Sequence, residues 1–336
     1  MKRKSKKIKE TDYLFLSAYL RALENGLLTG ARMDRMLDAP TAEDAAKILT
    51  ECGYGELNVV NVDTVDQMLS QARDRIFADL TPLAKDPRML DIFKIKYDYH
   101  NAKTLLKSEA MGEDPARLLV DAGRLPGKEL AKAVAASDYE GVSETLAKAI
   151  GEARELLGTT KDPQQADFLL DQAYFREMAR LAEDCRSEFM GGYVKLMVDA
   201  ANLRSAVRVL RMGKDRDFLK TVLFEGGSMD LEQLAQLADG KAVLADLYAR
   251  GPLAEAAELG QAAAHGGALT AFERACDNAL MEYISAAKQV PFGEQPLIAY
   301  LAARDSEQTA IRIILTGRLA GLPTDVIRER LREPYV

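Results

Sequence analysis

Three stretches of this sequence carry one residue pattern at intervals of about a hundred positions, and this repetition limits the folds open to the chain. Relative to the reference positions Asn101, Asn202 and Ala310, each copy has an acid three residues before, a basic residue two after and a glycine eleven after. The −3 acids are Asp98, Asp199 and Glu307, the +2 cations are Lys103, Arg204 and Arg312, and the +11 glycines are Gly112, Gly213 and Gly321. The reference positions are 101 and 108 residues apart. This spacing indicates three copies of one helical unit, each too small to bury a good core alone.

The repeats predict a three-part, pseudo-symmetric body. We place a first helical repeat with a basic tail at 1–115, a second at 116–222 and a third at 223–336. The boundaries could also be drawn on the other side of each repeated helix, so their exact positions are open.

The composition is that of a soluble globular protein, with 48% hydrophobic and 29% charged residues in a chain of 336. No stretch approaches eighteen uninterrupted apolar residues, and the basic opening Met1–Lys7 is not followed by the apolar core of a signal peptide. We therefore expect a cytoplasmic or peripheral protein whose basic opening is a disordered tail. The net charge of −7 argues against a general nucleic-acid binder.

Helix is predicted nearly throughout, because apolar residues recur at intervals of three and four and strand signals are scarce. Thr41 is predicted to be an N-cap, and Gly53 to end the segment that follows it. The β-branched stretch 58–62 fits a strand or, equally, a loop that leads to a capped helix. Further helices are predicted at 64–80, 90–111, 143–157, 166–184, 189–212, 230–239, 241–249, 269–288, 296–317 and 323–332.

The spacing within each repeat places the −3 acid and the reference residue on one side of a helix, beside an apolar stripe. The +2 cations point away from that side. One interpretation is that Asp98, Asn101, Asp199 and Asn202 satisfy buried loop amides while the cations are solvated. The other is that the +2 cations lie at equivalent places around a pseudo-threefold axis and contact a partner there.

Catalytic and metal-binding patterns are missing from the sequence. It has no phosphate-binding glycine loop, dinucleotide fingerprint, paired histidines or nucleophile elbow. The two histidines, His100 and His265, are interpreted as a helix-interface and a loop residue, and the single cysteines Cys52, Cys185 and Cys276 as packing residues. We therefore expect no catalytic residue, no cofactor, no metal and no small-molecule substrate.

Several separated segments resemble one family in the same order along the chain. They are residues 13–24, 36–40 leading to 51–54, 90–101, 193–218 and 311–336. They resemble the C subunit of bacterial and archaeal V/A-type rotary ATPases and ATP synthases, which is equivalent to the d subunit of eukaryotic vacuolar enzymes. Ala310 departs from the Asn expected there, which puts a polar role for the third copy in doubt but not the fold.

The resemblance implies an all-α funnel of three helical domains around a central cavity. It implies a non-catalytic rotor component of the central stalk, whose partners are the D and F subunits of the shaft and the membrane proteolipid ring. The protein would sit peripherally on the cytoplasmic face and pass rotation to the ring, where protons or sodium ions are transported. The alternative is a free-standing helical scaffold that binds a peptide or helix in its cavity, and an enzyme is a distant third.

Overall fold

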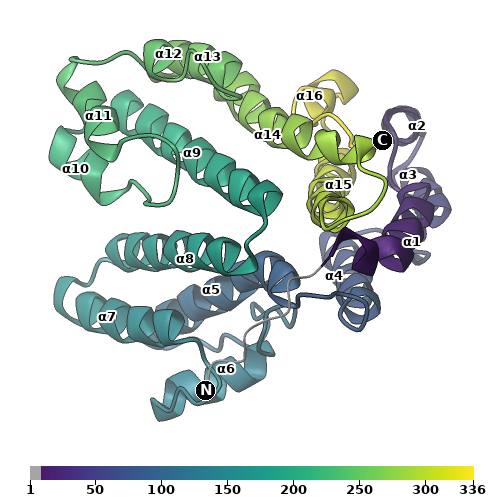
Figure 1. Ribbon diagram of the computed structural model, residues 1–336, viewed down its shortest axis with the longest axis horizontal. Helices are drawn as coiled ribbons and strands as arrows, with labels where there is room; N and C mark the ends of the chain where they lie inside the picture. The colour runs from purple at the N-terminus through teal and green to yellow at the C-terminus, as the bar shows by residue number, and fades with distance from the viewer. Residues whose placement is uncertain (1–8) are drawn as a thin grey trace. The chain divides into compact units, whose positions relative to one another are not determined.

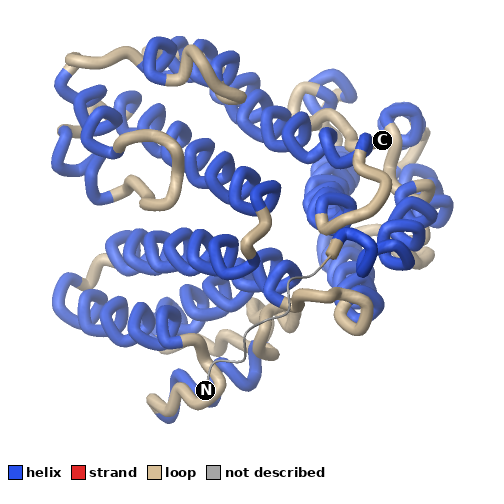
Figure 2. The backbone as a smooth tube through the Cα atoms, in the orientation of Figure 1, coloured by secondary structure: helices blue, strands red, loops and turns tan. Residues whose placement is uncertain are grey.

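The computed structural model describes residues 9–336, and every regular element in that part of the chain is a helix (Figure 1, Figure 2). This confirms the all-α prediction. The basic opening Met1–Lys7, where a tail was predicted, lies outside the described residues.

The chain divides into two compact units. The middle unit comprises Arg88–Gly267, and the terminal unit combines the residues up to Pro87 with Ala268–Val336. These limits differ from the predicted boundaries at 115/116 and 222/223, so the three domains and the funnel with its central cavity stay predictions.

In the middle unit, α8 packs along both α5 and α7, and α9 packs against α8 and α13 (Figure 1). The core between α5, α6, α7 and α8 contains Tyr99, Leu130, Ile150 and Leu170, all almost fully buried. The elements of this unit are α5 (Arg88–Met111), α6 (Gly127–Ala136), α7 (Glu144–Thr160), α8 (Pro163–Cys185), α9 (Glu188–Arg211), α10 (Arg216–Thr221), α11 (Leu231–Ala235), η3 (Gln236–Asp239), α12 (Leu244–Leu247) and α13 (Ala254–Ala264).

In the terminal unit, the long helix α15 is surrounded by α1, α2, α3, α4, α14 and α16. Its core joins Met36 and Val65 from the first part of the sequence to Ile314 from the last part. The fold of this unit therefore depends on segments that are far apart in the sequence. Its elements are η1 (Glu10–Tyr13), α1 (Leu14–Glu24), α2 (Gly30–Asp38), α3 (Ala42–Ile48), η2 (Leu49–Cys52), α4 (Val62–Leu80), α14 (Leu269–Ser285), η4 (Ala286–Gln289), α15 (Gln295–Leu319) and α16 (Thr324–Arg328).

The three repeated helices, α5, α9 and α15, end in the same way. The +11 glycines have φ values of 70°, 63° and 67°, in the left-handed region that favours glycine. The next residue in each copy donates its N–H to a carbonyl five residues earlier, from Glu113 to Ser108, from Lys214 to Val209 and from Leu322 to Gly317, at 2.9, 3.2 and 2.9 Å. These bonds satisfy carbonyls that a helix end leaves unpaired.

Local sequence signals place several other helix ends. Thr41 caps α3 by accepting a hydrogen bond from the Asp44 N–H at 3.1 Å, as predicted. Gly53 ends η2 in the left-handed conformation, also as predicted. Residues 58–62 lead into a capped helix, because Asn61 caps α4 by accepting from the Thr64 N–H.

Three helices, α6, α10 and α13, were not predicted, and α12 is shorter than the predicted helix at 241–249. Helix α6 begins at Gly127, whose N–H donates to Asp121 at 2.8 Å. Helix α13 is rich in alanine, the best helix former, and begins two residues after Pro252.

Candidate functional site

The −3 acid of the first repeat holds a loop that follows its helix. Asp98 on α5 has a side chain only 2% exposed, and its Oδ1 accepts from the backbone N–H groups of Arg124 and Leu125 at 2.9 and 3.4 Å. Its Oδ2 accepts from the Arg124 Nε at 2.7 Å. Burial raises the pKa of Asp98, while the Arg124 contacts act in the opposite direction.

Arg124 joins this carboxylate to a second buried one. Its Nη1 donates to Glu177 on α8 at 2.7 Å, and the other oxygen of Glu177 accepts from the Tyr99 hydroxyl at 2.8 Å. Burial is also the main reason that the pKa of Tyr99 is raised. The resulting cluster ties α5, α8 and the 112–126 loop together.

The −3 acid of the second repeat holds its loop through backbone groups. Asp199 on α9 accepts from the N–H groups of Ser228 and Met229, at 2.8 and 3.2 Å to Oδ1. Burial raises the pKa of Asp199, and these backbone donors partly offset the rise. Addition of a Cβ to Gly227 would place it 2.2 Å from Asp199 Oδ1, so the loop approaches as closely as glycine permits.

The two reference asparagines each pair with both backbone groups of one loop residue. Asn101 donates to the Val120 carbonyl at 2.7 Å and accepts from its N–H at 2.9 Å. Asn202 does the same with Phe224, at 2.9 and 2.7 Å. Both asparagines are fully buried. This two-bond contact fixes one point of each loop against its helix.

The −3 acid of the third repeat reaches residues near the start of the sequence. Glu307 on α15 accepts from the Leu28 N–H and the Tyr54 hydroxyl, both at 2.5 Å, and from Arg304 at 2.6 Å. Burial raises its pKa, and the Arg304 charge is the largest opposing influence. Ala310, at the reference position, is buried in the core of this unit. The third copy therefore keeps the acid–loop contact but lacks the amide pair.

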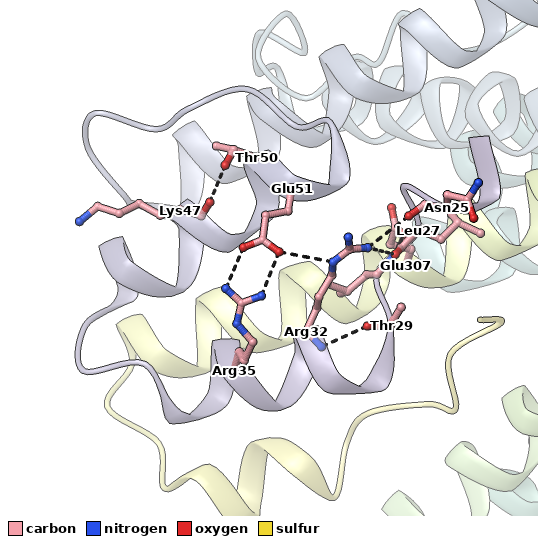
Figure 3. Close-up of polar contacts among 10 residues, drawn as sticks. Asn25, Leu27, Thr29, Arg32, Arg35, Lys47, Thr50, Glu51 and Glu307 are labelled. Atoms are coloured by element: carbon pink, nitrogen blue, oxygen red, sulfur yellow. Dashed lines mark hydrogen bonds and ion pairs between the residues drawn. The ribbon is translucent and has the colours of Figure 1, made fainter. Parts of the chain in front are cut away.

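The turn that carries Leu28 is held by a second set of contacts (Figure 3). Arg32 donates to the Leu27 carbonyl at 2.8 Å and lies 3.6 Å from Glu51, which in turn accepts from Arg35 at 2.7 and 2.9 Å. Figure 3 shows Glu51 between the two arginines, with Glu307 close behind the turn. A neighbouring pocket of 410 Å³ is lined by Arg304, Tyr300 and Cys52 among others.

The +2 cations lie beside neighbouring helices. Lys103 pairs with Asp171 on α8 at 2.5 Å, and Arg312 pairs with Asp66 on α4 at 2.8 Å. Arg204 is partly buried on α9 and also takes part in a polar or electrostatic contact. These contacts do not test whether the three residues bind another protein, so that role stays a prediction.

Within residues 9–336, no group of three His, Cys, Asp or Glu side chains could hold a metal ion. His100 is exposed and contacts the Leu118 carbonyl at 3.1 Å, so it is not the helix-interface residue that was predicted. His265 follows the end of α13. Cys52 and Cys276 are buried, and Cys185 is partly so. None of the helices in the described part of the chain is both long and apolar enough to cross a membrane.

Four residues of these clusters were not predicted from the sequence: Arg124, Glu177, Tyr54 and Arg304. Arg304 precedes Glu307 by three residues, so helical spacing could have suggested that pair. The other contacts are made across 26 to 253 residues of sequence, and no local pattern marks them.

Comparison with known proteins adds a family relationship. Residues 16–330 match the family model described as ATP synthase (C/AC39) subunit. The C subunit of the V-type sodium ATPase of Enterococcus hirae is 23% identical, over 96% of this chain and 99% of the relative. The C subunit of the V-type ATP synthase of Thermus thermophilus is 26% identical (95% and 98%), and that of the A-type ATP synthase of Methanocaldococcus jannaschii is 22% identical (95% and 86%).

Proposed function

This chain belongs to the family of ATP synthase (C/AC39) subunits, and on that premise we propose that it is a non-catalytic rotor subunit of the central stalk. It couples the shaft made by the D and F subunits to the proteolipid ring in the membrane. Rotation of the shaft then drives ion transport through the ring, or ion flow through the ring turns the shaft. The observation that carries this proposal is the match along residues 16–330, supported by relatives aligned over nearly their full length.

The packing of the chain suits the transfer of torque. A rotor part must resist twisting, and close-packed helices deform little. Each repeated helix is also bonded through its −3 acid to a segment that would otherwise be a flexible loop or turn. These buried contacts support stiffness within each unit, because loosening any one of them would leave a buried carboxylate with fewer hydrogen-bond donors.

The protein then acts at the cytoplasmic face of the membrane as a peripheral component. It binds no nucleotide, and its contacts are with protein surfaces. The +2 cations are our candidates for contacts with the shaft or ring, since charged groups on a surface set the orientation and rate of association.

Reconstitution with and without this chain tests the proposal. In a complex that lacks the chain, ATP hydrolysis by the catalytic head should continue, whereas ATP-driven ion uptake into vesicles should fall to background. Addition of the purified chain should restore uptake and should recover it bound to the shaft and the ring. Ion uptake that does not depend on the chain would contradict the proposal, and recovery of the chain without ring or shaft components would favour a free-standing scaffold.

A further inference from the structure

The pocket beside Arg304 lies between four elements of the terminal unit, α1, η2, α4 and α15. Its volume of 410 Å³ falls within the range of about 300–1,000 Å³ that is usual for small-molecule sites. Such sites combine an apolar lining with a few polar groups that fix the orientation of the ligand. The aliphatic lining residues here are Ala22, Leu23, Ala72, Ile76 and Leu80.

Arg304 on α15 lines this pocket and uses few of its hydrogen-bond donors. Its side chain is only 11% exposed, and its Nη1 donates to Glu307 at 2.6 Å. Its Nε is buried without a partner, and its Nη2 donates to no group within residues 9–336. An arginine has five N–H donors, and buried donors that stay unpaired cost stability. Arg304 therefore has donors left for an acceptor in the pocket.

Tyr300, one turn before Arg304 on α15, supplies a second donor. It is 2% exposed, and burial is the main reason that its pKa is raised to about 12. Its hydroxyl makes no hydrogen bond within the described part of the chain, whereas the Tyr54 hydroxyl donates to Glu307. The guanidinium carbon of Arg304 lies 6.0 Å from the centroid of the Tyr300 ring. A buried tyrosine hydroxyl usually has a partner, so this one is also available to a ligand.

The acidic groups of the lining are more exposed and lie near arginines. The Glu51 side chain is 42% exposed, accepts from Arg35 and lies 3.6 Å from Arg32 (Figure 3). Asp79 is exposed and lies one turn after Arg75 on α4, and both line the pocket. The acids are therefore at the accessible edge of the pocket, while the two buried polar side chains of α15 are donors.

We propose that this pocket binds a small organic anion with an apolar body. Carboxylate or phosphate oxygens of the ligand accept hydrogen bonds from Arg304 and Tyr300, and its apolar part contacts Leu23 and Ile76. The bound ligand joins α1, η2, α4 and α15 and so stabilises the terminal unit. This binding is additional to the coupling of rotation and does not depend on it.

The two kinds of lining favour this ligand over simpler ones. A neutral apolar molecule leaves the buried donors unpaired, and a cation offers them no acceptor. An inorganic anion leaves the aliphatic side chains in contact with water. Hydrogen bonds between a guanidinium and a carboxylate or phosphate are among the strongest in proteins, which suits a site with few polar groups.

Titration calorimetry of the purified full chain tests the proposal. The probes are octanoate and octyl phosphate, with 1-octanol as the neutral and octylamine as the cationic comparison. We expect the anions to bind at least about tenfold more tightly than the alcohol or the amine, because hydrogen bonds to charged groups are stronger than neutral ones. Saturating anion should also slow hydrogen exchange in the terminal unit.

Two substitutions remove the donors with little other change. Tyr300→Phe keeps the ring and deletes only the hydroxyl, so urea unfolding should be unchanged while anion binding weakens at least about tenfold. Arg304→Lys keeps the charge beside Glu307 but loses the planar fork of donors, and it should weaken binding to a similar extent. Tyr19→Phe is the matched control, because Tyr19 lies in the same unit outside the lining of the pocket. This control should bind the anions as the original chain does.

Three results would overturn the proposal. They are the absence of anion binding at millimolar concentration, equal affinity for octanoate and 1-octanol, and unchanged anion binding after Tyr300→Phe. If neither anion bound but the purified D and F subunits bound with an affinity that Tyr300→Phe lowered, the pocket would be a protein contact and the proposal would be wrong. Because the anion titrations use the isolated chain, their outcome is independent of whether the chain couples rotation.

Discussion

Replacement of Arg124 by methionine gives the most direct measure of what the buried carboxylates contribute. Arg124 is bonded at 2.7 Å to both Asp98 and Glu177, whose side chains are 2% and 4% exposed. Methionine retains much of the side-chain length but donates no hydrogen bond. The variant therefore leaves two buried acids without their shared cation, although Asp98 keeps its backbone donors and Glu177 keeps Tyr99.

Removal of one partner from a buried ion pair typically costs about 3–5 kcal/mol, because the remaining charge stays in a poorly solvating place. We expect Arg124→Met to lower the free energy of unfolding of the middle unit by about this amount at pH 7. A domain has about 5–15 kcal/mol of stability in total, so the loss should be large but need not abolish folding.

The loss should also depend on pH. Burial already raises the pKa of Asp98 above its ordinary value, and removal of the Arg124 charge should raise it further. A carboxyl group with a raised pKa in the folded state favours folding when protonated. The free-energy cost of burying its charge is absent at pH values below the pKa of this group in the unfolded chain. The cost grows as the pH rises through its pKa in the folded state. Arg124→Met should therefore be less harmful at about pH 4.5 than at about pH 7.

Urea unfolding followed by circular dichroism at both pH values measures these losses, and hydrogen exchange in α5 and α8 assigns them to the middle unit. Arg216→Met is the matched control, because Arg216 also pairs with two carboxylates, Glu232 and Asp239, but at an exposed place. The control should show a much smaller loss. Equal losses for the two variants, or a loss for Arg124→Met that does not change with pH, would refute the reasoning.

Three further outcomes are expected. Asn202→Ala should cost about 2–4 kcal/mol in urea unfolding, because it leaves both backbone groups of Phe224 buried and unpaired, and a loss below about 0.5 kcal/mol would contradict this. Gly213→Ala, just after the end of α9, should lower the free energy of unfolding by about 1 kcal/mol because φ there is 63°. Gly191→Ala, within α9 and with open space around the added Cβ, should not lower it. Reversal of all three +2 cations should weaken binding of the D–F shaft or the ring at low salt in a pull-down assay, and unchanged affinity would remove them as contact residues.

The sequence predicted the repeated helices well because the relevant signals are local. A glycine eleven residues after the reference position marks a helix end, since only glycine adopts the left-handed conformation there without a steric cost. Thr41 likewise acts on an N–H three residues away. The periodicity did not reveal α6, because Pro126 and Gly127 are typical of loops as well as of helix starts.

The clusters around the −3 acids could be predicted only in part. Spacing placed each acid beside a buried stripe, but it could not identify which backbone or side chain would satisfy it. Arg124 lies 26 residues after Asp98, and Glu177 lies a further 53 residues on. Such contacts depend on which helices become neighbours, and that follows from packing of the whole unit rather than from any local pattern.

The third repeat combines segments from the two ends of the described chain. In the first two copies, the −3 acid accepts from backbone N–H groups 26 to 30 residues later. In the third, the corresponding N–H belongs to Leu28, which lies 279 residues earlier and just before α2. The segment that begins with α2 therefore packs with α15 in the place where, in the first two copies, the segment that follows the repeated helix packs.

A chain that joins Ala268–Val336 through a flexible linker to residues 9–87 should accordingly fold alone, because it contains Glu307 together with Leu28, Tyr54 and Arg304. The Tyr335 hydroxyl lies 3.5 Å from Glu24, at the end of α1. Because α1 is about 16 Å long, a short linker can reach from the last residue back to the segment before α1. Residues 9–87 without the last part should not fold stably, because their core would lack Ile311, Ile314 and Leu315. Circular dichroism and hydrogen exchange distinguish these cases. A stably folded 9–87 fragment would contradict this prediction, because it would show that α15 is not needed to complete the core.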